Sequence, residues 1–249
     1  VAGMQTWKVD YVPLGKVITA VGFVEFNERD RRQVTARTKG RLDRLFVNET
    51  GAMVKSGDLL ASLYSPELNV TMQNLLDAKR ANDTRLLESA RTRLRLLGVD
   101  DKQTDAVLAA GEANTHVKIL SPISGHVITK YVQEGQYVEE GTPLYDVADL
   151  STVWVQAQVY EDDMAFLPLD QVHTEGGPKS APLSVTAIAR SMPDEPFVGR
   201  LAFVYPHVDQ DTRTVTVRCE IDNPGHKLRP GGTATVRIEV PAKNGNFLV

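Results

Sequence analysis

The stretch GRLDRLFVNETGAMVKSGDLLASLYS, Gly40 to Ser65, returns downstream as GHVITKYVQEGQYVEEGTPLYDVAD, Gly125 to Asp149. Each copy of this repeat is about 30 residues long and begins with a glycine and alternating apolar residues. A turn glycine follows, and a second glycine stands six residues after it: Gly51 and Gly57 in the first copy, Gly135 and Gly141 in the second. Turn glycines supply positive φ, and alternating apolar residues are typical of half-buried strands. Two units of this size cannot each bury a core, so we expect them to pack together as one small two-fold β-sandwich.

The segment between the copies has the pattern of helices. It opens at Ser65-Pro66-Glu67, where serine suits an N-cap, proline suits the first helical position, and glutamate favours a helix N-terminus. Asn82-Asp83-Thr84 then marks a break and a new cap, and Gly98 ends the second helix. Two sets of apolar residues have helical spacing, namely Leu68, Met72, Leu75 and Leu76, and Leu87, Ala90, Leu94 and Leu97.

A third short helix is predicted from Asp100, which with Gln103 resembles a capping box, to Gly111. The first two helices, of about 13–16 residues, reach only about 20–24 Å. We therefore expect a short hairpin with a third helix folded against it. On the pattern alone, a helical insertion without a partner remains an alternative.

From Leu150 onward the chain has β character. Val153, Val155, Ala157 and Val159 alternate along one face of a strand, and further alternating segments are SVTAIARSM, FVGRLAFVY, TVTVRCEI and TATVRIEV. Short strands separated by turn signals predict a barrel or sandwich, which GKVITAVGFVEF can join from the N-terminal side. Cys219 and Trp154 are expected in its core.

Composition and motifs exclude several classes of function. The chain is 42% hydrophobic and 24% charged with a net charge of −4, which indicates a globular protein and no nucleic-acid binder. No apolar run of the length needed for a transmembrane helix and no signal peptide occurs, so we expect a mature or trimmed chain whose membrane anchor lies outside it. The cationic run Arg29, Arg31, Arg32, Arg37, Lys39, Arg41 and Arg44 is interpreted as a solvated face, or as a surface that meets an acidic neighbour.

The sequence carries no recognisable reaction chemistry. Nucleotide loops and the HExxH, CxxC and GxSxG motifs are absent, and the five histidines are scattered without metal-ligand spacing. We therefore expect no catalytic residues, no cofactor and no metal site. Thioethers suit Cu(I), which makes the lone N-terminal Met4 the one candidate metal ligand.

The two repeat copies resemble the halves of a lipoyl or biotinyl carrier domain, in which a short turn between the halves displays a modifiable lysine. Here roughly 50 residues stand at that point, without a lysine in a tight turn. This split arrangement resembles the periplasmic adaptors of the membrane fusion (HlyD-like) family. LFVNETGAMVKSGDLLASLYSPEL and TRTVTVRCEIDNPGHKLRPGGTATVRI are similar to the heavy-metal (copper/silver-type) branch, although the hairpin is about two turns shorter than is usual there.

The resemblance implies a mainly β, elongated multidomain fold with a helical hairpin insert. We expect a split lipoyl-like sandwich at 31–64 plus 117–149, a helical hairpin at 65–116, and a β-barrel at 15–30 plus 150–240. Residues 1–14 would be a remnant of a membrane-proximal domain, and 241–249 the start of its truncated second segment.

The function implied is that of an adaptor between an inner-membrane RND transporter and an outer-membrane channel, for export of heavy metals or small molecules. The adaptor would be periplasmic, associated with the inner membrane, and a trimer or hexamer in the assembled pump. Partner contacts are expected at the hairpin tip, Asn82, Asp83 and Thr84, and hinges at Asp30, Ser65, Pro66, Thr115 and Asp149. The alternatives are a lipoyl- or biotinyl-type carrier and a periplasmic metal-binding chaperone.

Overall fold

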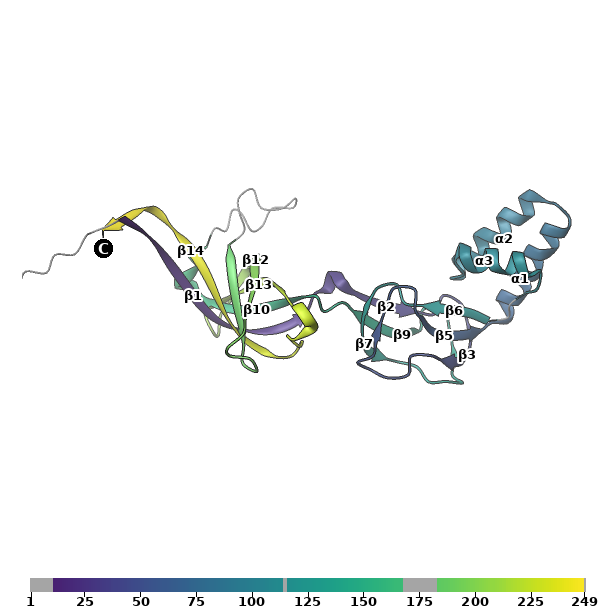
Figure 1. Ribbon diagram of the computed structural model, residues 1–249, viewed down its shortest axis with the longest axis horizontal. Coiled ribbons are helices and arrows are strands. Elements are labelled where there is room, and N and C mark those ends of the chain that lie inside the picture. Colours follow the sequence, from purple (N-terminus) through teal and green to yellow (C-terminus); the bar gives the residue numbers. More distant parts are fainter. Residues whose placement is uncertain (1–10, 114–115, 168–182, 249) are drawn as a thin grey trace, which may run out of the picture. The chain divides into compact units, whose positions relative to one another are not determined.

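The structure, a computed structural model, describes residues 11–113, 116–167 and 183–248, and the side chains of 15–113, 116–167 and 183–240. The chain divides into two compact units, one of Glu28–Asp149 and one of Val1–Asn27 with Leu150–Val249 (Figure 1). The boundary between the units falls after Asn27, three residues before the expected barrel limit at residue 30. The reason is local, because Glu28–Asp30 form a 3-10 turn whose Asp30 carbonyl accepts a hydrogen bond from the Asp149 N–H.

The Glu28–Asp149 unit contains a sandwich of two four-stranded sheets. One sheet has the order β2-β9-β7-β4 and the other β6-β5-β3-β8. The strands are β2 (Arg31–Thr35), β3 (Gly40–Leu45), β4 (Met53–Val54), β5 (Leu59–Tyr64), β6 (His116–Leu120), β7 (Gly125–Lys130), β8 (Tyr137–Val138) and β9 (Pro143–Ala148). Because β4 pairs with β7 and β8 pairs with β3, each repeat copy lends a strand to the other's sheet, and the two copies form one sandwich.

The turn glycines make equivalent hydrogen bonds in the two halves. The Gly51 N–H donates to the Val127 carbonyl at 2.7 Å, and the Gly135 N–H donates to the Leu42 carbonyl at 2.7 Å. Both glycines have positive φ, +87° and +82°, which side-chain-bearing residues rarely adopt. The sandwich is therefore two-fold symmetric in its backbone hydrogen bonds as well as in its strand order.

One core position breaks this symmetry. Tyr145 on β9 is fully buried, and its hydroxyl donates to the Val47 carbonyl at 2.9 Å. Burial raises its pKa to about 12. The tyrosine therefore stays neutral and satisfies a carbonyl inside the core.

We expect Gly125→Ala and Gly40→Ala to destabilise this unit to a similar extent. An added Cβ would lie 2.3 Å from the Ala148 carbonyl oxygen at Gly125, and 2.2 Å from the Tyr64 carbonyl oxygen at Gly40. Both obstacles are backbone, so each variant should lose about 1–3 kcal/mol through overpacking. Urea unfolding followed by circular dichroism at 222 nm measures this, and wild-type stability in either variant would contradict it.

The other unit is a closed six-stranded barrel of order β1-β10-β13-β12-β11-β14. The inward side chains of β10 include Val153, Val155, Ala157 and Val159, as the alternation predicts. The strands are β1 (Tyr11–Phe26), β10 (Thr152–Tyr160), β11 (Ser184–Ala189), β12 (Pro196–Asp209), β13 (Thr214–Asp222) and β14 (Thr233–Leu248), with a short helix α4 (Glu161–Met164) and a 3-10 turn at Pro224–His226.

Strands β1 and β14 pair beyond the expected barrel limits, from Gly15↔Pro241 to Tyr11↔Leu248. The backbone at 11–14 and 241–248 thus continues the two barrel strands as an antiparallel pair. The rest of the ranges assigned to a membrane-proximal domain, 1–10 and 249, lies outside the described residues.

Two predictions for the barrel core had different outcomes. Cys219 is fully buried in the core, and burial raises its pKa to about 12, so it is an inert apolar group as expected. Trp154 is buried but does not belong to the barrel core, because it alternates with the inward Val153 and Val155. It lies on the outer face, where the Arg218 guanidinium carbon is 4.1 Å from its ring centroid.

Candidate functional site: the helical insert, its tip and its root

Three helices occupy the connection from β5 to β6: α1 (Pro66–Arg80), α2 (Thr84–Leu96) and α3 (Asp101–Ala110). One apolar cluster holds them together, and Leu68, Leu75 and Leu94 within it have no exposed surface. Every residue of the two predicted stripes contributes to this cluster, with Leu87 and Leu97 at its partly exposed margin. The hairpin with a folded third helix is therefore confirmed.

The helix ends follow the sequence signals with two exceptions. Asp83 caps α2 by accepting from the Leu86 N–H at 3.0 Å, and Gly111 ends α3 with a φ of 72°. Ser65 stands at the N-cap of α1 but makes no capping hydrogen bond, because its fully buried hydroxyl faces that of Thr38 at 3.4 Å. The capping box at Asp100 is only half formed. Its carboxylate accepts from the Gln103 N–H at 2.7 Å, while the Gln103 side chain points to β6.

The structure brings the three predicted tip residues together between α1 and α2. Asn82 has a φ of 51°, Asp83 is the cap, and Thr84 is the first residue of α2. Asn82 and Thr84 are exposed, and Asp83 is half-buried. The tip is a compact polar turn that presents two of its three side chains to solvent.

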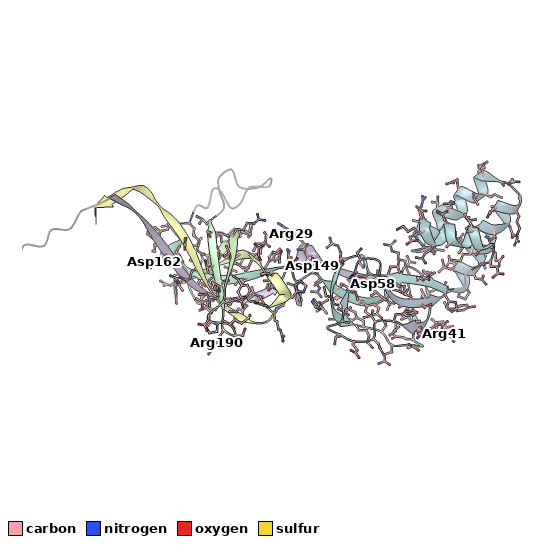
Figure 2. All side chains as sticks on the ribbon, in the orientation of Figure 1. Arg29, Arg41, Asp58, Asp149, Asp162 and Arg190 are labelled. Atoms are coloured by element: carbon pink, nitrogen blue, oxygen red, sulfur yellow. The ribbon has the colours of Figure 1, made fainter. Side chains whose placement is uncertain are left out.

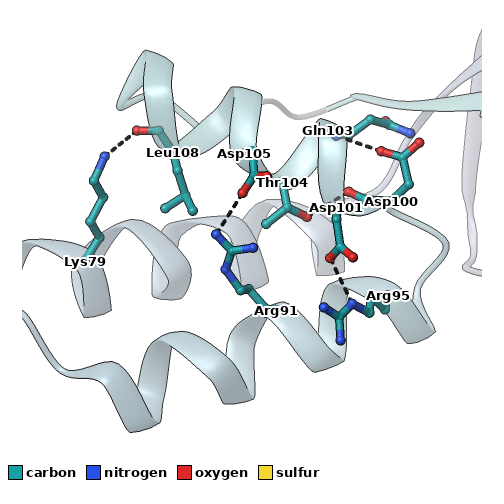
Figure 3. Close-up of polar contacts among 9 residues, drawn as sticks. All are labelled: Lys79, Arg91, Arg95, Asp100, Asp101, Gln103, Thr104, Asp105 and Leu108. Atoms are coloured by element: carbon teal, nitrogen blue, oxygen red, sulfur yellow. Dashed lines mark hydrogen bonds and ion pairs between the residues drawn. The ribbon is translucent and has the colours of Figure 1, made fainter.

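Polar contacts fasten α3 to the hairpin in antiparallel register (Figure 3). Arg91 pairs with Asp105 at 2.8 Å and Arg95 with Asp101 at 2.8 Å. The two arginines are four residues apart on α2, and the two aspartates are four residues apart on α3. The Lys79 ammonium donates to the Leu108 carbonyl at 2.5 Å, near the other end of α3. These exposed pairs contribute little stability, but they fix which faces of the helices meet.

At its root the insert contacts the edge strand β6 and the segment that follows the other edge strand, β2. A groove of about 440 Å³ lies between β2 and β6, and its walls include Leu97, Gly98 and Gln103 of the insert. The basic side chains Arg32, Arg37 and Lys118 line it together with Asp100. Val117 of β6 is buried in the helical cluster and not in the sandwich core.

The predicted hinge residues occupy the two ends of the sandwich. Asp30 and Asp149 are joined by a 3.0 Å backbone hydrogen bond where the chain crosses to the barrel unit. Ser65 and Pro66 begin α1 at the other end, and Thr115 lies outside the described residues.

A buried carboxylate, Asp146, anchors the first residue of β2. The Arg31 guanidinium pairs with its Oδ2, which also accepts from the Tyr131 hydroxyl at 2.9 Å. Burial alone would raise the pKa of Asp146, but the hydrogen bonds from Arg31 and Tyr131 outweigh it and hold the pKa below its usual value.

The opposite end of the sandwich carries a second carboxylate, Asp43, on β3. Its carboxylate accepts a hydrogen bond from Arg41 at 2.6 Å and is hydrogen-bonded to the His116 ring at 2.8 Å. Both contacts lower the pKa of Asp43, and the contact with Arg41 has the larger effect. Arg41 and Asp58 lie on the surface of the same unit (Figure 2). Members of the cationic run are thus engaged in specific pairs, as Arg31 and Arg41 show.

The described residues contain no group of three or more His, Cys, Asp or Glu side chains that could hold a metal ion. Met4 and His173 lie outside them. No helix in the described part of the chain is long and apolar enough to cross a membrane.

Because the ligand-type residues are scattered, we predict no tight Cu(I), Ag(I) or Zn(II) site within residues 1–249. Titration calorimetry of the chain with each ion should give no stoichiometric binding in the sub-micromolar range. Such binding would overturn the prediction, and loss of that binding in Met4→Leu would assign the ion to the N-terminal methionine.

Sequence reasoning missed the root contacts. The sequence pattern predicts a capping box for the Gln103 side chain, whereas its amide pairs with the backbone of β6. Local spacing carries no signal for such a contact. The α2–α3 pairs could have been found, because Arg91 and Arg95 match Asp101 and Asp105 in spacing.

Comparison with known proteins agrees with this geometry. Residues 31–148 match the family described as CusB, barrel-sandwich hybrid domain, and residues 152–242 match CusB-like, beta-barrel domain. The split sandwich with its helical insert and the barrel place the chain in the membrane fusion class of proteins. The chain belongs to this family, and both of its matched domains are of the CusB-like type.

Several relatives carry related names. The chain is 25% identical over 242 residues to the cation efflux system protein CusB of Escherichia coli K12, covering 97% of this chain and 56% of the relative. It is 26% identical to the putative membrane fusion protein SilB of Salmonella typhimurium, with coverage of 97% and 54%. The chain therefore spans about half the length of the curated relatives that it matches.

Among solved structures, ZneB from Cupriavidus metallidurans is 24% identical with a TM-score of 0.56. The match covers 91% of this chain and 99% of that one. At this identity the likeness shows the fold alone.

Proposed function

We propose that the chain is the working part of a periplasmic adaptor that joins an inner-membrane RND transporter to an outer-membrane channel. The observation that carries this is the helical hairpin, which occupies the β5–β6 connection where a carrier domain would display its lysine. The relatives named as cation efflux and membrane fusion proteins favour heavy-metal export, with small molecules as the wider class. Energy would come from the transporter, so the adaptor supplies shape and joints and no catalysis.

The parts have distinct roles in this proposal. The barrel docks on the periplasmic part of the transporter, the sandwiches of neighbouring copies pack side by side in a trimer or hexamer, and the hairpin tip meets the channel. Asn82, Asp83 and Thr84 are the proposed contact residues. The polar tip supports this, because the exposed side chains of Asn82 and Thr84 can form hydrogen bonds with a partner while Asp83 continues to cap α2.

The tip contact can be tested with a photo-reactive amino acid at Thr84 in the intact adaptor, expressed in its host. Cross-linking should yield an outer-membrane channel protein, identified by mass spectrometry. The same amino acid at Lys55, in an exposed turn of the sandwich, is the control and should not yield it. Equal yields from both positions, or a channel product from neither, would refute the tip assignment.

Hinges are proposed at both ends of the sandwich, at Asp30 and Asp149 and at Ser65, Pro66 and Thr115. Paired crossings leave few residues between bodies, so small φ/ψ changes there swing whole units. Copies in different crystal forms should superpose well domain by domain, that is, barrel, sandwich and helical insert each by itself, and poorly overall. Cross-linking barrel to sandwich should abolish efflux without unfolding the chain, and continued efflux would make the adaptor a rigid spacer.

The carrier alternative requires a modified lysine. Mass spectrometry of the protein purified from its host should give the unmodified mass, and a lipoyl or biotinyl adduct would favour a carrier instead.

A further inference from the structure

An edge strand of the sandwich is bonded to a helix of the insert through one glutamine. Strand β6 ends its sheet, so one side pairs with β5 and the other is an open edge. On that side the Lys118 N–H donates to Gln103 Oε1 at 3.3 Å, and Gln103 Nε2 donates to the Lys118 carbonyl at 3.4 Å. A side-chain amide has the donor and acceptor of a peptide group, so Gln103 stands in for one residue of a further strand.

The turn that leads into α3 also contacts the segment that follows the other edge strand, β2. A Cβ added at Gly98 would lie 3.0 Å from Arg37 Cδ, so this turn is seated directly on Arg37, just beyond β2. Gly98 and Gln103 both line the groove between β2 and β6. Insert and sandwich are therefore in contact at two places outside the chain crossings.

On its opposite side α3 is bonded to the hairpin by the Arg91–Asp105 and Arg95–Asp101 pairs. Helix α3 thus contacts the hairpin with one side and the sandwich with the other. We propose that Gln103 is a positioning residue whose amide latches α3 to β6 and so fixes the direction in which the hairpin leaves the sandwich. The latch rests on the proposed adaptor function for its purpose, since it would control the hinge at Ser65 and Pro66.

The latch is suited to open and close. Both hydrogen bonds are longer than the usual range for amides. Lys118 is exposed and Gln103 is half-buried, so water can replace these bonds. The hydrophobic cluster of the insert does not include Gln103, so release of the amide leaves the helices packed on one another.

The test uses the 249-residue chain with spin labels on cysteines at Ala81, beside the tip, and Lys55, in the sandwich. The native Cys219 has no exposed surface and does not compete for label. Pulsed electron resonance should give one narrow distance distribution for the latched chain and a broad one for Gln103→Leu. Gln73→Leu, the same exchange at an exposed position of α1, is the matched control and should stay narrow.

Hydrogen exchange gives a second readout at the latch itself. Loss of one hydrogen bond of this kind should speed exchange of the Lys118 amide by about threefold to tenfold in Gln103→Leu. Circular dichroism at 222 nm should be unchanged, because the helices stay packed. A narrow distribution together with wild-type exchange at Lys118 would overturn the proposal.

Gln103→Glu separates positioning from general packing. An ionised carboxylate can accept from the Lys118 N–H but cannot donate to its carbonyl, so the latch should be open at neutral pH. Below about pH 4, near the ordinary glutamate pKa, the acid regains a donor and the narrow distribution should return. If the distance distribution of Gln103→Glu does not change with pH, and that of Gln73→Glu does not either, the donor to the Lys118 carbonyl has no positioning role.

The two proposals fail separately. A latch that behaves as expected in the isolated chain, with full efflux in cells carrying Gln103→Leu, would refute its role in the adaptor and keep the structural assignment. Failure of the tip to cross-link to the channel would refute the tip assignment of the proposed function and leave the latch intact.

Discussion

Replacing Leu94 with alanine is expected to lower the free energy of unfolding of the Glu28–Asp149 unit by about 2–5 kcal/mol. Leu94 has no exposed surface and lies at the centre of the cluster formed by all three helices and Val117. The substitution removes three buried carbon atoms and leaves a cavity that rigid helices fill only in part. The loss should therefore exceed that of any surface change in the insert.

The measurement can be confined to this unit. Helices α1, α2 and α3 all belong to it, so circular dichroism at 222 nm reports its unfolding. Trp154 belongs to the barrel, so tryptophan fluorescence includes the barrel's own signal, which should not change. Leu96→Ala is the matched control, because Leu96 is 74% exposed on the same helix and its truncation should stay within about 0.5 kcal/mol. Equal effects of the two leucines would contradict the packing described.

Arg31→Met is expected to destabilise the same unit by about 2–4 kcal/mol, because it leaves the carboxylate of Asp146 buried without its cation. The estimate is set below that for a fully enclosed pair because the Arg31 side chain is 45% exposed. Methionine keeps much of the aliphatic stem, so the change tests mainly the charge. Arg32→Met, at an exposed neighbour that donates to backbone carbonyls, should cost less than about 1 kcal/mol.

The pH dependence has a definite sign. In the native chain the pKa of Asp146 is lowered, so its stabilising contribution is complete above the unfolded value of about 3.9 and is lost as pH falls through the folded value. In Arg31→Met the largest of the contacts that lower this pKa is lost, so the pKa of Asp146 in the folded variant should lie above that in the native chain and the variant should take up its proton at higher pH. The stability difference between the two proteins should therefore be largest near neutral pH and shrink towards pH 4. A difference that is the same at both values would show that Asp146 is not the cause.

Much of the architecture could be predicted because local patterns set it. The glycine turns and alternating residues of each repeat copy define strands with one apolar and one polar face. The two copies bury their apolar faces by packing them against each other. Leu68, Met72, Leu87 and Leu94 likewise have the spacing of packed helices, and the structure pairs them. The tip followed from Asp83, since a strong cap locates a helix start to within a residue.

What could not be predicted depends on contacts between distant segments. Ser65 is a good cap by composition, but burial against Thr38 turns its hydroxyl away from the helix. Trp154 alternates with core residues, yet the cation that covers it comes from β13, 64 positions along the chain. The pairing of Arg31 with Asp146 spans 115 positions, and no local spacing reveals it.

The two-fold symmetry of the sandwich has a consequence for how such a protein could arise. The strand ends Tyr64 and His116, where the helices attach, correspond to Ala148 and Arg31, where the chain leaves for the barrel. A duplicated ancestral half would thus provide two attachment points of the same design at opposite poles. The helical insert is attached at one end of the sandwich and the barrel at the other, and the strands between the two ends keep the same pairing in both halves. Lineages could then lengthen or replace the element at one pole while the other kept its fit.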